Sequence, residues 1–243
     1  MQLRVLFIIL SGRQEHHLKT NQTKPIKIKK PLLDFELDTT EDLRSLLAEC
    51  QENDLDIYHK HIKNVCLDNL SFNGLEFSGV IFENCTFTKV AIKKASFDNV
   101  LFKSCDFSNS NFSDSWFNCC EFNHVKNAGA DLRNSRFFDV KIEDSTFNYA
   151  NFSASRFDAC VILKSDMSDT FFAECNFKSL ELNDSRFVRT DFFKTSLSKL
   201  DFSTCDLQSI CISDDKKELK GAIVNTFQAT DLSKFLGIII KDD

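Results

Sequence analysis

The sequence predicts an all-β solenoid that winds from about Val65 to Asp214 as roughly thirty consecutive five-residue repeats. An apolar residue returns at every fifth position from Leu67 to Ile212, and 29 of these 30 positions are apolar. The same positions, called here the repeat centres, hold 19 of the 26 phenylalanines in the chain. A helix would place apolar residues three and four apart and a flat strand would alternate them, so neither explains a period of five.

A second inward position lies two residues before each repeat centre. It is filled by small or aliphatic residues, whereas the other three positions of the repeat are mostly polar. Two inward positions in every five residues indicate a short strand followed by a corner. Glycine (6) and proline (2) are too scarce for conventional hairpins, so other residues must make the corners.

This pattern resembles the pentapeptide-repeat family over about 150 of the 243 residues, and the phase never slips from Leu67 to Ile212. The resemblance implies a right-handed quadrilateral β-helix, in which four repeats form one square coil of about twenty residues. Residues twenty apart would then stack about 4.8 Å from each other along the rod. We expect the β-helix to occupy residues 55–214.

Residues 1–37 are expected to form a partly disordered N-terminal extension, with residues 1 to about 22 disordered. The apolar run Leu3 to Leu10 is too short to span a bilayer and is short even for the core of a signal peptide. Met1 and Met167 are the only methionines, so a start at a non-methionine codon further along is an alternative to the start at Met1.

Both ends of the β-helix expose unpaired strand edges and should be capped. Residues 38–54 are predicted to contain a helix from Thr39 to Asn53 that covers the first coil, with Thr39 or Asp38 as its N-cap. Its apolar face would consist of Leu43, Leu46, Leu47 and Cys50.

Residues 215–243 leave the five-residue phase and predict a helix from about Thr226 to Leu236, a stop at Gly237 and a strand of three isoleucines. This ending resembles the Qnr-type subgroup of the family, in which a C-terminal helix and strand join two rods tail to tail. The resemblance implies dimer contacts at Ile223, Phe227, Leu232, Phe235, Leu236, Ile238, Ile239 and Ile240. An end cap on a monomer is the alternative.

No arrangement of residues indicates catalysis. The histidines match no usual zinc spacing, and the sequence contains no phosphate-binding loop or cofactor motif. Six of the ten cysteines occupy the small inward position, where they fill space and have no histidine in their stacks. We therefore assign no catalytic, metal or cofactor-binding residue and expect a non-enzymatic protein. The many cysteines favour a reducing cytoplasm, and no association with a membrane is expected.

One of the four sides of the predicted coil is acidic. Seven acidic residues lie on it against three lysines, Lys103, Lys141 and Lys164, whereas the other sides are nearly balanced. The acidic face consists of Glu83, Glu121, Glu143, Asp144, Glu181, Asp184 and Asp201. No face is net basic, so direct binding of nucleic acid is not expected.

An acidic rod attracts basic grooves such as those that hold DNA. Resemblance to the Qnr-type subgroup implies a homodimer that mimics duplex DNA, engages DNA gyrase or topoisomerase IV, and protects them from quinolones or modulates them. The chain lacks the loop insertions of the best-known Gram-negative members and resembles the loop-free ones. The alternative is a pentapeptide-repeat interaction scaffold with a different protein partner.

Two irregularities could mark contact sites. Four outward aromatic residues, Trp116, Phe138, Phe171 and Phe193, form two candidate apolar patches for a partner. Asn127 is the one polar repeat centre, and either a buried asparagine bonded along its stack or a local bulge would explain it.

Overall fold

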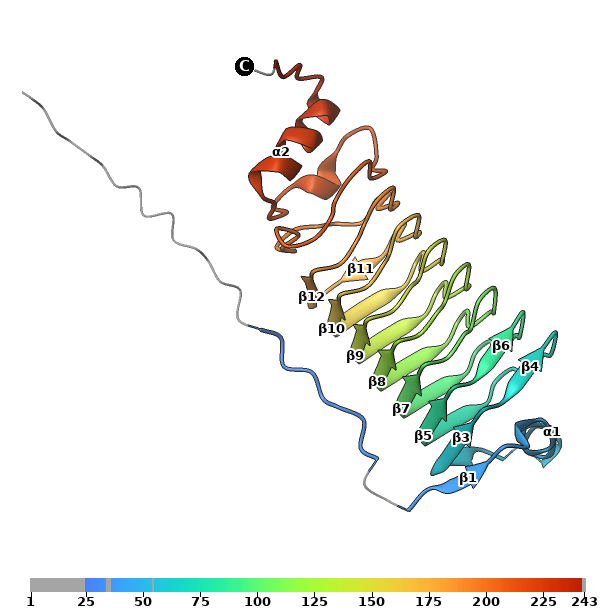
Figure 1. Ribbon diagram of the computed structural model, residues 1–243. Helices are drawn as coiled ribbons and strands as arrows, with labels where there is room; N and C mark the ends of the chain where they lie inside the picture. Colours follow the sequence, from blue (N-terminus) through green and yellow to red (C-terminus); the bar gives the residue numbers. More distant parts are fainter. Residues whose placement is uncertain (1–24, 34–35, 54, 242–243) are drawn as a thin grey trace, which may run out of the picture.

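The computed structural model describes residues 25–33, 36–53 and 55–241 as a rod of stacked coils with a short helix at each end (Figure 1). The fold is the predicted right-handed quadrilateral β-helix, of about seven turns. The expected disorder of residues 1 to about 22, and the apolar run Leu3 to Leu10, lie outside the described residues.

Parallel strands hold the coils together with a register of twenty residues, so that Phe97 pairs with Phe77 on one side and Phe117 on the other. Ten strands form one sheet in the order β1-β3-β5-β7-β8-β9-β10-β11, with β2 joined to β5 and β12 to β10, while β4 and β6 form a second sheet. The strands are β1 (Asp38–Thr40), β2 (Ile57–Tyr58), β3 (Lys60–Lys63), β4 (Cys66–Asp68), β5 (Glu76–Glu83), β6 (Thr86–Thr88), β7 (Ser96–Lys103), β8 (Trp116–Asn123), β9 (Arg136–Glu143), β10 (Arg156–Leu163), β11 (Asn176–Phe177) and β12 (Leu180–Asn183). This register confirms four repeats per coil.

The repeat centres fill the interior with stacked phenylalanine rings. The rings of Phe97 and Phe117 are 4.8 Å apart and 7° from parallel, and those of Phe117 and Phe137 are 4.9 Å apart and 2° from parallel. Rings on adjacent sides of a coil meet edge to face, as Phe102 and Phe107 do at 5.5 Å and 88°. Both arrangements suit the quadrupole of an aromatic ring, and they explain why phenylalanine dominates the centres.

The corners are made mostly by non-glycine residues with left-handed backbone, although Gly74, Gly79 and Gly129 also occupy corner positions. Examples are Asn84 (φ 54°), Asp114 (φ 60°) and Ala159 (φ 54°). A non-glycine residue in this region is strained by about 1–2 kcal/mol. The backbone ladders above and below each corner hold it in place, which explains how the chain manages with so few glycines.

Small inward positions carry a second hydrogen-bond ladder. The backbone N–H of Ala95 donates to the hydroxyl of Ser115 (3.1 Å), that of Ser115 to Ser135 (3.2 Å) and that of Ser135 to Ser155 (3.0 Å). Each hydroxyl thus satisfies a buried amide one coil away. This explains why the position accepts serine and threonine as well as alanine and cysteine.

The N-terminal cap differs from the prediction in its first turn. Helix α1 spans Leu43–Asn53, and Asp42 caps it by accepting a hydrogen bond from the Ser45 N–H (3.1 Å), so the predicted N-cap at Thr39 or Asp38 is wrong. Asp38 to Thr40 instead form β1, because the open edge of β3 offers backbone partners that a helix cannot use. The predicted apolar face is confirmed.

In the apolar face of helix α1, the side chains of Leu43, Leu47 and Cys50 are buried and that of Leu46 packs against the core.

Three short helical segments close the other end of the rod. They are η1, a 3₁₀ turn (Lys217–Leu219), α2 (Thr226–Ser233) and η2, a 3₁₀ turn (Lys234–Leu236). Gly237 (φ 72°) ends the last one as predicted. Ile238 to Ile240 form no strand, so that part of the prediction is wrong; within the described chain no edge lies beside them to supply hydrogen-bond partners.

The structure leaves Asn127 without a bulge. Its neighbour Lys126 pairs with Asp106 and Thr146 in the normal twenty-residue register, so the proposed bulge is wrong. Asn127 is buried, and its side-chain oxygen has no hydrogen-bond partner among the described residues, so the predicted bonding along the stack is absent for that atom.

No helix in the described part of the chain is long and apolar enough to cross a membrane.

Candidate functional site

Four of the seven acids of the acidic face lie on strands of one side of the rod, Glu83 on β5, Glu121 on β8, Glu143 on β9 and Glu181 on β12, while Asp144, Asp184 and Asp201 lie outside the strands. Glu121 pairs with Lys141 on β9, and Glu143 lies in register with Asn123 on β8, so the acids alternate with basic and neutral residues along the rod axis. Asp144 and Asp184 are exposed, and the remaining five acids are half-buried. The side that the sequence predicts therefore exists as a continuous surface.

Some of these charges are compensated within the chain. Glu83 accepts hydrogen bonds from Lys103 (2.8 Å) and His61 (2.9 Å), and the bond from Lys103, followed by that from His61, holds the pKa of Glu83 below its ordinary value. Lys141 forms an ion pair with Glu143.

Five acids of the face are not compensated in this way. Among the described residues no ion pair forms with Glu121, Asp144, Glu181, Asp184 or Asp201. These five acids carry the charge that the face can offer to a basic partner, and Asp144 and Asp184 are the two that are exposed.

Residues 25–33, named here the strap, run along one edge of the rod beside this face (Figure 1). The strap's backbone N–H groups donate to side chains of the rod: Ile26 to Glu181 (2.7 Å), Lys29 to Asp139 (3.1 Å) and Leu32 to Asn99 (3.0 Å).

The strap was missed in the sequence, where it belonged to the N-terminal extension. The available signal was the run Pro-Ile-Lys-Ile-Lys-Lys-Pro at residues 25–31, because prolines favour extended chain.

The rod residues beneath the strap form a corner column, defined as Asn99, Cys119 and Asp139. They are successive residues of one corner, twenty apart, and Asp139 is 3% and Cys119 8% exposed. The equivalent corner residues Asp114 and Asp144, on other corners of the rod, are exposed. Since the strap bonds to Asn99 and Asp139, it must pass over Cys119 between them.

All four predicted outward aromatics are at the surface. Trp116 is 47%, Phe138 38%, Phe171 42% and Phe193 40% exposed. Trp116 and Phe138 line one shallow hollow on β8 and β9, and Lys29 of the strap lies 6.0 Å from the Phe138 ring.

A further outward aromatic, Tyr149, is 61% exposed at a corner position and was missed, although an aromatic in a polar phase was a usable signal.

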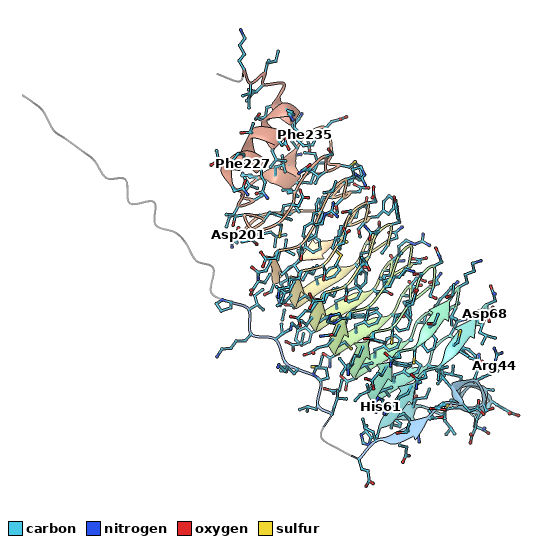
Figure 2. The ribbon with its side chains drawn as sticks, in the orientation of Figure 1. Arg44, His61, Asp68, Asp201, Phe227 and Phe235 are labelled. Atoms are coloured by element: carbon cyan, nitrogen blue, oxygen red, sulfur yellow. The ribbon has the colours of Figure 1, made fainter. Side chains whose placement is uncertain are left out.

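The C-terminal apolar residues divide into two groups. Leu232 and Phe235 pack against the core of their own chain, and Ile223 pairs with Asp201 at the end of the last coil. Figure 2 shows Phe227 and Phe235 on the helical cap beyond Asp201. The exposed group, named here the end patch, consists of Phe227, Leu236, Ile238, Ile239 and Ile240, with Phe227 86% and Ile239 87% exposed.

Two buried thiols of the rod, those of Cys160 and Cys175, are poor nucleophiles. All ten cysteines are free, and burial raises the pKa of both Cys160 and Cys175 to about 12. A thiol with a raised pKa holds little thiolate at neutral pH. Among the described residues no group of three or more histidine, cysteine, aspartate and glutamate side chains is placed to hold a metal ion.

Comparison with known proteins fits this architecture. Residues 55–132 match the family model described as a pentapeptide repeat region, and residues 172–208 match the model for eight copies of the repeat. The chain belongs to the pentapeptide-repeat family. No curated protein sequence matches this pentapeptide-repeat chain.

Several solved structures are similar to the chain, with TM-scores below 0.5. A trypsin-treated variant of QnrB1, a plasmid-mediated fluoroquinolone resistance protein, is 23% identical over 75% of this chain and 92% of its own, with a TM-score of 0.46. Rfr23 from the cyanobacterium Cyanothece 51142 is 11% identical over 56% and 97%, with a TM-score of 0.38. HetL from Nostoc sp. strain PCC 7120, involved in heterocyst differentiation regulation, is 13% identical over 76% and 92%, with a TM-score of 0.30. At these identities the similarity concerns the pentapeptide-repeat fold alone.

Proposed function

We propose that this pentapeptide-repeat protein is a non-enzymatic, cytoplasmic DNA mimic that binds DNA gyrase or topoisomerase IV and protects it from quinolones or modulates it. The observation that carries the proposal is the acidic face, on which seven acidic residues lie against three lysines along one side of the rod. A basic groove that holds DNA attracts negative charges spaced along a stiff cylinder. The acidic face supplies the negative charges, and the rod supplies the stiff cylinder.

A homodimer formed through the end patch is part of the proposal. The patch exposes five large apolar side chains at the tip of the rod, and such a surface is costly to leave in water. Joining two rods at this end would bury the patch and place two acidic faces on one longer particle.

The test is gyrase supercoiling with ciprofloxacin, titrating the full-length protein, alongside the same titration without drug. Restored supercoiling supports protection, and inhibition without rescue supports a mimic that modulates the enzyme. The triple variant Glu121→Gln, Asp144→Asn, Asp184→Asn removes three of the five charges that have no ion pair and should lose most of either effect. A matched control, Asp68→Asn, Glu76→Gln, Asp114→Asn, removes three exposed acids from the other sides and should behave as wild type.

A scaffold for a different protein partner is the second candidate. The strap favours it, because its three lysines lie beside the acidic face and reduce the charge that a DNA-binding groove would meet. No effect of the protein on either gyrase or topoisomerase IV would select the scaffold.

A further inference from the structure

The side chains that accept hydrogen bonds from the strap recur at a regular spacing along the rod. Ile26, Lys29 and Leu32, whose amides donate to the rod, are three residues apart, and their acceptors Glu181, Asp139 and Asn99 are about two coils apart. Three residues of extended chain and two stacked coils each span roughly 10 Å. The spacing of an extended backbone therefore matches the spacing of the rod along this edge.

The hydrogen bonds that hold the strap come only from side chains on the surface of the rod. Each of its three hydrogen bonds ends on a side chain of the rod, and none uses a backbone group of the coil ladders. Removing the strap would leave the β-helix hydrogen bonds intact. The strap thus occupies a surface that exists without it.

The strap leaves one buried acceptor atom of this surface without a hydrogen bond. Asp139 is buried beneath it, and its second carboxylate oxygen has no hydrogen-bond partner among the described residues. The Lys29 ammonium lies 3.8 Å from that oxygen, beyond hydrogen-bond distance. A buried carboxylate oxygen without a hydrogen bond is unfavourable. A segment that brought an arginine to this point could bond both oxygens.

We propose that this edge of the rod is a peptide-binding track, occupied in cis by the strap, whose partner is an extended basic segment of another protein. The partner would lay one backbone N–H on an acceptor every third residue and direct a basic side chain to Asp139. The strap would compete with it from within the same chain. The track does not require a topoisomerase, and its test uses none.

The test measures binding of a fluorescent peptide with the sequence of residues 25–33 by anisotropy. The receptors are the wild-type chain and a full-length variant with Lys27→Glu, Lys29→Glu and Lys30→Glu, in which the strap repels the acidic track. A tethered segment competes at an effective concentration near millimolar. We expect the variant to bind the peptide at least about tenfold more tightly than the wild type does. Equal affinity would overturn the proposal.

Matched substitutions locate the binding. In the variant chain, Asp139→Ala should weaken peptide binding severalfold and Asp114→Ala should not. Alanine fits at this corner, since Ala159 holds the same conformation one coil further on. A peptide with Lys29→Arg should bind more tightly. A peptide with Lys29→Pro, which lacks the amide that bonds Asp139, should bind less tightly than one with Lys30→Pro. An affinity indifferent to Asp139 would refute the track.

Cys119 gives an independent readout of strap position. Alkylation of Cys119 should be faster in the charge-reversed variant than in the wild type, and added peptide should slow it again, while the exposed Cys66 reacts equally in all samples. A change from dimer to monomer in the variant, with no gain in peptide binding, would mean that the strap exchanges between two copies and would overturn the cis arrangement.

Discussion

Asn127 is the residue whose environment agrees least with its chemistry. It lies in a stack of apolar centres between Phe107 and Phe147, it is 2% exposed, and its side-chain oxygen is unpaired among the described residues. Leu67 and Leu207 occupy centres of the same stack. An aliphatic side chain is therefore compatible with this position.

We expect Asn127→Leu to raise the free energy of unfolding by about 1–3 kcal/mol, because it removes a buried polar group without a partner. Thermal and urea denaturation would measure the change. Asn127→Asp, of nearly the same size, should be less stable than the wild type because it buries an unpaired carboxylate. A lower melting temperature for Asn127→Leu would mean that the asparagine is satisfied by a group not seen here, such as a buried water.

At the scale of elements, the coils could be predicted from the sequence and the additions to them could not. A period of five with a second inward position two residues earlier is a local pattern, and it places every centre from Leu67 to Ile212. The strand β1 and the strap depend instead on contacts with residues far away, the latter with Glu181, 155 residues from Ile26. No local pattern identifies such a partner, and the acidic face was therefore predicted without the segment that lies beside it.

The C-terminal helix closes the last coil chiefly through one side chain. Gln228, which is buried, donates to the carbonyl oxygens of Phe202 (2.8 Å) and Cys205 (2.7 Å), and its own carbonyl accepts the Asn225 N–H that completes a capping box. Both carbonyls lie at the end of the rod; that of Phe202 also accepts the Cys205 N–H (2.8 Å).

We expect Gln228→Ala to lower the free energy of unfolding by about 2–4 kcal/mol, because it leaves the Cys205 carbonyl unpaired, removes one of the two hydrogen bonds to the Phe202 carbonyl and breaks the capping box. The control Thr230→Ala removes only a hydroxyl bond on the exposed side of the same helix and should change stability little. Comparing the two melting temperatures tests the role of Gln228, and equal values would contradict it.

At the scale of the whole molecule, the rod offers three surfaces, the acidic face, the track and the end patch, of which the first two share Glu181. The end patch is the part of the proposal that oligomeric state can test directly. Phe227→Asp together with Ile239→Asp should yield a monomer in light scattering after size-exclusion chromatography, since two charges on the patch would oppose its burial. Trp116→Asp, which replaces an exposed aromatic residue on the side of the rod, should leave the wild-type state unaltered. A monomeric wild type would make the patch an end cap only.

The twenty-residue register has a consequence for how such a chain can change in evolution. Each coil touches only the coils next to it, so gaining or losing twenty codons lengthens or shortens the rod without moving any residue to another side. An insertion of five or ten codons would instead rotate everything beyond it by a quarter or half turn and break up the acidic face. Because the strap spans two coils with every three residues, a one-coil change between Asn99 and Asp139 would also put their amide partners out of step.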